Sequence, residues 1–86
     1  MKEFDYKIQD KLGIHVRPAG QLAQVVKEKP DVVVTISNGD KQADVTKLFA
    51  VMGLAVKCGD TVHITVEGKD EEIVAGEVET FLKEHL

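Results

Sequence analysis

The sequence predicts one α+β domain over residues 1–86, an open two-layer sandwich in the order βαββαβα with three helices on one face of a four-stranded antiparallel sheet. Three observations predict this architecture. A chain of 86 residues can form only one small core. Three stretches have the alternation or β-branched composition of strands, a fourth strand is expected as the partner in a hairpin, and three segments between and after the strands are predicted as helices. The last predicted strand has a polar second face, so the helices need to cover only one side of the sheet.

The first strand and the first helix are separated by a short loop. Residues 2–9 alternate between apolar and polar side chains, as a half-buried strand does, and residues 10–13 form the loop. Because proline suits the first turn of a helix, we predict that a helix begins at Pro18 and runs to about Lys29, before Pro30. The apolar side chains predicted to face inward are Phe4, Tyr6 and Ile8 on the strand and Ala19, Leu22, Ala23 and Val26 on the helix.

A hairpin is predicted next. Residues 32–36 are rich in β-branched side chains and lead into Asn38-Gly39, a dipeptide typical of type I′ turns. The returning arm at residues 40–44 is polar, which suits a short strand at the edge of the sheet.

The second predicted helix is short, from Thr46 to Met52, and ends at Gly53. So small a helix cannot bury all of its apolar residues, and Leu48 and Phe49 are expected to form an exposed apolar patch. The residues expected to supply part of the core are Val51, Met52, Leu54 and Val56.

The last strand and helix complete the predicted order. Residues 61–67 alternate, and Asp70 is predicted to cap a final helix whose first turn contains Glu71 and Glu72. The predicted inward residues are Val62, Ile64 and Val66 on the strand and Val74, Val78, Phe81 and Leu82 on the helix.

Composition excludes several classes of function. The net charge is −4 and no basic stripe is present, which argues against a nucleic-acid partner. Cys58 is the only cysteine, so no internal disulfide or cysteine-based metal cluster can form. No apolar stretch is long enough to enter a membrane, and we expect a cytoplasmic monomer that uses no metal or cofactor.

The segment from Gly13 to Gly20 carries the chemistry of the chain. It places a titratable imidazole, His15, and a fixed positive charge, Arg17, at the entry to the first predicted helix. Unpaired N–H groups at a helix start attract anions, and an imidazole can hold a transferred phosphoryl group covalently. From the residues alone, His15 could equally be an ordinary loop residue. His63 is interpreted as a solvated strand residue, and His85 as a structural residue.

This segment, Gly-Ile-His-Val-Arg-Pro-Ala-Gly, resembles the active-site signature of the histidine-containing phosphocarrier (HPr) family of the bacterial phosphotransferase system. The similarity extends along the chain to Asn38-Gly39, to the segment from Phe49 to Leu54, and to the last strand and helix. An HPr-like open-faced sandwich is the fold that this resemblance implies, in agreement with the order predicted above.

The resemblance implies a carrier and not an autonomous enzyme. His15 would accept a phosphoryl group on Nδ1 from phosphorylated enzyme I and donate it to sugar-specific enzyme IIA domains. Arg17 and the helix start at Pro18 and Ala19 would stabilise the phosphoryl group. The partner-docking residues implied by the family are Gly20, Leu48, Phe49, Val51 and Met52, among which Val51 could equally belong to the core.

One position departs from the family. Many HPr proteins of Gram-positive bacteria have a kinase-regulated serine at the start of the second helix, where this chain has either Thr46 or Lys47, depending on the direction of counting. We therefore expect kinase control to be weak or lost. Two alternative functions remain open: a related carrier in a regulatory or nitrogen-linked phosphorelay, and an interaction domain of the same fold without phosphotransfer.

Overall fold

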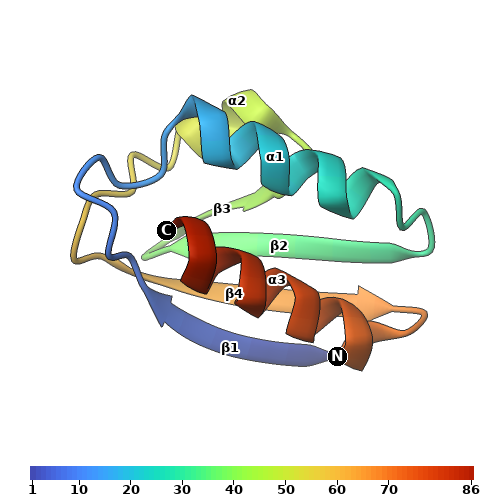
Figure 1. Cartoon of the computed structure of the whole chain (residues 1–86). Helices are drawn as coiled ribbons and strands as arrows, with labels where there is room; N and C mark the ends of the chain where they lie inside the picture. Colours follow the sequence, from blue (N-terminus) through green and yellow to red (C-terminus); the bar gives the residue numbers. More distant parts are fainter.

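A computed structural model describes all residues, 1–86, and confirms the predicted fold class. One face of a single sheet is covered by the helices, and the other face is open (Figure 1). The elements in chain order are β1 (Lys2–Lys7), α1 (Val16–Lys27), β2 (Val32–Asn38), β3 (Lys41–Asp44), α2 (Leu48–Met52), β4 (Thr61–Gly68) and α3 (Glu71–His85).

The sheet has the strand order β1-β4-β2-β3, and every neighbouring pair is antiparallel. β4 lies between β1 and β2, so Ile64 pairs with Phe4 on one side and with Ile36 on the other. The polar strand β3 is at the edge, as predicted, where its side chains discourage pairing with other chains.

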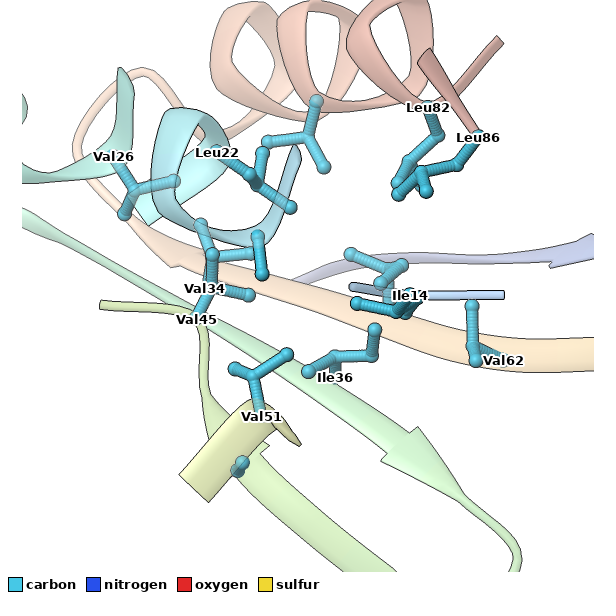
Figure 2. Close-up of a cluster of buried hydrophobic side chains, with 14 of the residues drawn as sticks. Ile14, Leu22, Val26, Val34, Ile36, Val45, Val51, Val62, Leu82 and Leu86 are labelled. Carbon is cyan, nitrogen blue, oxygen red and sulfur yellow. The ribbon is translucent and has the colours of Figure 1, made fainter. Parts of the chain in front are cut away.

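The core lies between the sheet and the helices. Side chains from β2 and β4 point toward α1 and α3 (Figure 2). Ile14 from the loop before α1, Val51 from α2 and Leu86 at the C-terminus belong to the same cluster. Period-two alternation places Val62, Ile64 and Val66 in this layer, and all three are completely buried. Phe81 was predicted to be buried but is only half-buried. Its ring packs against that of the exposed His85 on the same helix, with 4.4 Å between the two ring centroids.

The start of α1 differs from the prediction. The helix begins at Val16, with His15 as its N-cap, two residues before Pro18. Proline is tolerated anywhere in the first turn, because none of the N–H groups there has a partner within the helix. Pro18 is therefore the third helical residue and does not mark the first.

The hairpin turn is displaced by one residue. Asn38 still belongs to β2, where it pairs with Lys41, and the two central residues are Gly39 and Asp40. Of these two, only Gly39 has a positive φ, so the predicted type I′ turn is wrong. The Asn38 side chain instead donates a hydrogen bond to the carbonyl oxygen of Leu54 at 3.1 Å.

Both ends of α2 also differ from the prediction. The helix begins at Leu48 with Lys47 as its N-cap, while Thr46 precedes it. Gly53 ends the helix in a right-handed conformation, with φ of −65°, so this position does not need the positive φ that glycine allows. The left-handed residue in this connection is Ala55, with φ of 52°.

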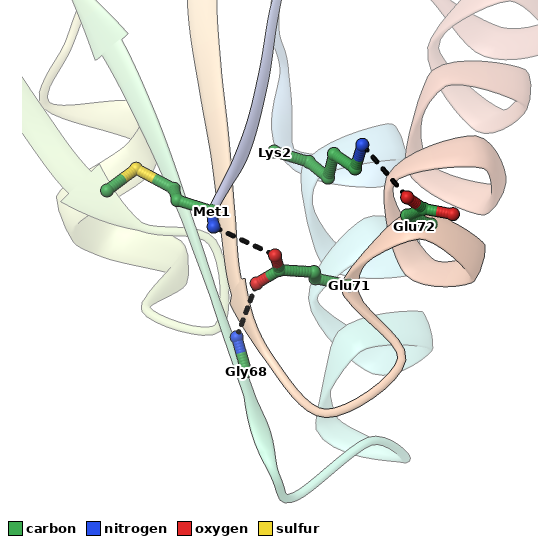
Figure 3. A network of polar contacts seen from close by, with 5 residues as sticks. All are labelled: Met1, Lys2, Gly68, Glu71 and Glu72. Carbon is green, nitrogen blue, oxygen red and sulfur yellow. Dashed lines mark hydrogen bonds and ion pairs between the residues drawn. The ribbon is translucent and has the colours of Figure 1, made fainter.

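The start of α3 is held by Glu71 and not by the residue predicted to cap it. Asp70 occupies the N-cap position in a left-handed conformation, and its side chain makes no capping hydrogen bond. Glu71 accepts hydrogen bonds from the Gly68 N–H at 3.1 Å and from the Met1 ammonium at 2.8 Å (Figure 3). The Met1 ammonium is the main cause of a lowered pKa for Glu71. Beside this network, Lys2 forms an ion pair with Glu72 at 3.0 Å.

Candidate functional site

A shallow depression of about 250 Å³ surrounds the predicted histidine. Three segments form it: the loop after β1, the first turns of α1 and the end of α3. The carbonyl oxygen of Leu86 accepts hydrogen bonds from the N–H groups of Gln9 and Asp10, which ties the end of α3 to the loop. The residues that line the depression are Asp10, His15, Arg17, Pro18, Gln21 and His85.

His15 stands at the junction between a tight loop and the helix. Gly13 has φ of +68°, and a side chain there would collide with the backbone of Val56. Ile14 is buried and donates its N–H to the Val56 carbonyl at 3.2 Å, which anchors the loop on one side of the histidine. The His15 side chain keeps 34% of its surface exposed, so its ring is accessible to another protein.

The unpaired N–H groups at this helix start belong to Val16 and Arg17. Neither one makes a hydrogen bond in the structure. The phosphoryl-binding helix start was expected at Pro18 and Ala19, but the helix begins at Val16, and neither residue offers a free donor, since proline has no N–H and the Ala19 N–H donates to the His15 carbonyl at 3.1 Å. The positive end of the helix therefore presents two free donors next to His15.

Arg17 adds a full positive charge to this end of the helix. Its side chain is exposed and forms no ion pair with any carboxylate of the chain. A free guanidinium can turn its donors toward the oxygens of a phosphoryl group. The geometry at this point therefore suits a small anion held close to the His15 ring.

A carboxylate also reaches His15, from the loop. Asp10 Oδ2 lies 3.4 Å from His15 Nε2. The pKa of Asp10 is lowered, mainly by the hydrogen bond from the Leu12 N–H and to a smaller extent by His15. The sequence signal for this contact was the short spacing of the two residues across the turn at Gly13.

The predicted docking residues divide into an exposed group and a buried one. Phe49 is 87% exposed, and Leu48 and Met52 are half-buried. Val51 is only 4% exposed and packs in the core, which is the alternative that the sequence left open for this residue. The reason is helical geometry: in one short helix, Val51 points to the sheet while Phe49 points away from it.

Apolar surface also extends onto α1, which packs beside α2 (Figure 1). Gly20 is half-buried, and a Cβ added to it would meet no atom within 4 Å. Two exposed apolar residues that sequence reasoning missed are Leu12 and Val16, at 72% and 60% exposure. Both lie within a few residues of His15 along the chain.

Comparison with known proteins decides the family. The model of the PTS HPr component phosphorylation site matches residues 2–84, nearly the whole chain. The chain belongs to the HPr family. Members of this family are the phosphocarrier proteins of the phosphotransferase system, and this chain is a phosphocarrier of that type.

Relatives support this assignment at both sequence and fold level. The phosphocarrier protein HPr of Lysinibacillus sphaericus is 38% identical over 85 residues, which cover 98% of this chain and 94% of the relative. The HPr structure from Thermoanaerobacter tengcongensis has a TM-score of 0.89 at 26% identity, covering 96% of this chain and 92% of that one. A Mycoplasma HPr structure has a TM-score of 0.90 at 28% identity, covering 96% and 93%.

In this HPr-family chain, Lys47 is the N-cap of α2, and its side chain makes no capping hydrogen bond. Thr46 is turned back toward β3, where its hydroxyl donates to Asp44 Oδ1 at 2.7 Å and its N–H donates to the same oxygen at 2.8 Å. Of the two candidate regulatory positions, the N-cap is therefore Lys47 and not Thr46.

A second histidine cluster lies on the open face of the sheet of this HPr-family chain. His63 contacts Asp5 and Glu3 through its two ring nitrogens. The sequence interpretation of His63 as merely solvated missed these contacts, because they depend on the pairing of β1 with β4.

No group of three or more His, Cys, Asp or Glu residues is arranged to hold a metal ion. None of the helices has the length and apolar character needed to cross a membrane.

Proposed function

We propose that His15 Nδ1 accepts a phosphoryl group from phosphorylated enzyme I and passes it to enzyme IIA domains of the phosphotransferase system. The observation that carries this proposal is the position of His15 as the N-cap of α1, next to two N–H groups without partners and an arginine without an ion pair. The HPr-family membership supports the partners.

The chemistry needs little covalent work from the protein. The Nδ1 lone pair attacks phosphorus, the N–P bond to the donor histidine breaks, and the electron pair leaves with the donor ring. The charge on the transferred oxygens is stabilised by Arg17 and by the N–H groups of Val16 and Arg17. Because the site is a shallow depression and not an enclosed cavity, these contacts hold the group without preventing its discharge.

The exposed apolar side chains of α2 suggest where partner proteins dock. We propose that Phe49, Leu48 and Met52 of α2, together with the uncrowded backbone at Gly20, form the surface that both partners contact. In this scheme the chain acts as a cytoplasmic monomer and as a stoichiometric carrier, without a metal or cofactor. Sedimentation of the purified protein tests the monomeric state.

The phosphocarrier proposal is tested by incubation with enzyme I and phosphoenolpyruvate. We expect one acid-labile, alkali-stable phosphoryl group per chain, none on His15→Ala, and slow labelling of a folded Arg17→Ala protein. His63→Ala serves as the matched histidine control and is expected to be labelled normally. Undiminished labelling of His15→Ala would show that the wrong histidine has been chosen. Labelling by a nitrogen-linked enzyme I alone would favour the regulatory phosphorelay.

A further inference from the structure

The loop before α1 holds one carboxylate oxygen in a defined place. The N–H of Asp10 donates to the Leu86 carbonyl at 2.8 Å, and its carbonyl accepts the Gly13 N–H at 2.9 Å. Its Oδ1 accepts the Leu12 N–H at 2.8 Å. With the backbone and one oxygen engaged, Oδ2 is the oxygen that faces His15.

The two nitrogens of the His15 ring are thereby made unequal. A carboxylate only accepts hydrogen bonds, so Nε2 facing Asp10 favours the form of the ring that carries its proton on Nε2. In a neutral ring, Nδ1 then has the free lone pair. We propose that Asp10 is a positioning residue for phosphoryl transfer, which keeps the proton on Nε2 and presents Nδ1 as the nucleophile; this inference rests on the proposed function of His15.

The same contact acts on the charge that transfer creates. When Nδ1 bonds to phosphorus, the proton stays on Nε2 and the ring becomes positive, so no proton has to leave the site. The 3.4 Å separation is longer than an optimal hydrogen bond of about 2.9 Å, and attraction between the new imidazolium and the carboxylate shortens it. Asp10 therefore stabilises the phosphorylated carrier as well as the attacking tautomer.

The other charged or titratable side chains near the ring do not contact Nε2. Arg17 and His85 line the same depression, and Arg17 serves the phosphoryl oxygens. Neither side chain makes a hydrogen bond to Nε2, whose partner is Asp10. Removal of the Asp10 carboxylate should therefore change which nitrogen of the ring carries the proton. It should leave the donors to the phosphoryl oxygens, at Val16 and Arg17, unaltered.

The decisive variant is Asp10→Asn. Its side-chain oxygen can still accept the Leu12 N–H, which places the amide NH₂, a donor, opposite Nε2. A donor there favours a lone pair on Nε2 and a proton on Nδ1, the nitrogen that must attack. We expect charging by enzyme I to slow about tenfold, which corresponds to about 1.4 kcal/mol. The ¹⁵N spectrum of the neutral, unphosphorylated ring should shift toward the Nδ1–H form.

Asp40→Asn is the matched control, because it removes the same charge from an exposed turn of the hairpin. Asp10→Ala is the second variant, and the thermal midpoint of each protein reports its folding. Wild-type charging rates and wild-type ¹⁵N shifts in both folded Asp10 variants would overturn the inference, and would show that Asp10 only braces the loop. Failure of enzyme I to label the wild-type protein would instead count against the proposed function, since the ¹⁵N measurement does not require phosphorylation.

Discussion

His63 Nδ1 on β4 lies 2.6 Å from Asp5 Oδ1 on β1, its direct partner across the sheet. On the other side of the ring, Nε2 lies 2.8 Å from Glu3 Oε1. A ring that faces two carboxylates can donate to both only when both nitrogens carry protons. The pKa of His63 is accordingly raised, mainly by the hydrogen bond to Asp5 and then by that to Glu3.

This cluster makes stability depend on pH. A raised folded-state pKa contributes stability that is fully present below the unfolded value, about 6.5, and that is lost as the pH rises through the folded value. We expect the thermal midpoint of the wild-type protein to fall over this range, and His63→Gln to flatten the profile. His85→Gln is the control, because His85 forms no ion pair. Parallel profiles for wild type and His63→Gln would contradict the assignment.

The histidine clusters show where sequence reasoning succeeds and where it stops. Alternation alone predicted that Val62 and Ile64 point inward, because a strand has a fixed period of two residues. The same alternation placed His63 outward but could not show its partners, which lie about 60 residues away in the sequence and come together only through strand pairing.

Short segments were predicted less well than long ones. The short helix α2 has too few turns for a clear apolar stripe, so the exposure of Phe49 was expected but the place of Val51 stayed open between the core and the docking surface. His15 was located from its motif and its position before Pro18. Its N-cap role and its contact with Asp10 depend on backbone angles and loop shape that the sequence pattern does not specify.

Replacement by alanine should have opposite effects on the free energy of unfolding at two glycines near the site. At Gly13 the φ is positive and an added Cβ collides with the backbone of Val56, so Gly13→Ala should destabilise the protein by about 2–5 kcal/mol. At Gly20 the Cβ would meet nothing, and the better helix propensity of alanine should add about 0.5–1 kcal/mol. Urea unfolding measures both changes. Equal effects of the two substitutions would be inconsistent with the loop geometry.

Gly20→Ala also tests the docking proposal without damage to the fold. If the missing side chain allows close approach of a partner, the stabilised variant should be charged more slowly by enzyme I. Charging at the wild-type rate would show that Gly20 has no role in docking.

Phe49 should matter for transfer and not for folding. Because its side chain is 87% exposed, Phe49→Glu should change the free energy of unfolding by less than about 0.5 kcal/mol while it raises the KM for charging by enzyme I. Ile73→Glu, at a residue 63% exposed on α3, is the matched control and should leave charging unaltered. An equal loss in both variants would point to a general charge effect and not to docking at α2.

Val51 should matter for folding and not for transfer. Its side chain is 4% exposed within the core, so Val51→Ala should lower the free energy of unfolding by about 1–3 kcal/mol. Below the unfolding transition, the folded variant should be charged at the wild-type rate. A large loss of charging in a fully folded Val51→Ala protein would restore this residue to the docking surface.

The residues at the start of α2 should make this chain a poor substrate for an HPr kinase. Lys47 cannot accept a phosphoryl group, and a phosphate on Thr46 would lose the hydrogen bond to Asp44 and be repelled by that carboxylate. We expect no rapid ATP-dependent labelling of the wild-type protein by an HPr kinase. Lys47→Ser should supply both a capping side chain, worth about 1 kcal/mol in urea unfolding, and a hydroxyl acceptor at the helix start. Stoichiometric labelling of Thr46 in the wild-type chain would overturn this prediction, because it would show that the contact with Asp44 does not protect the hydroxyl.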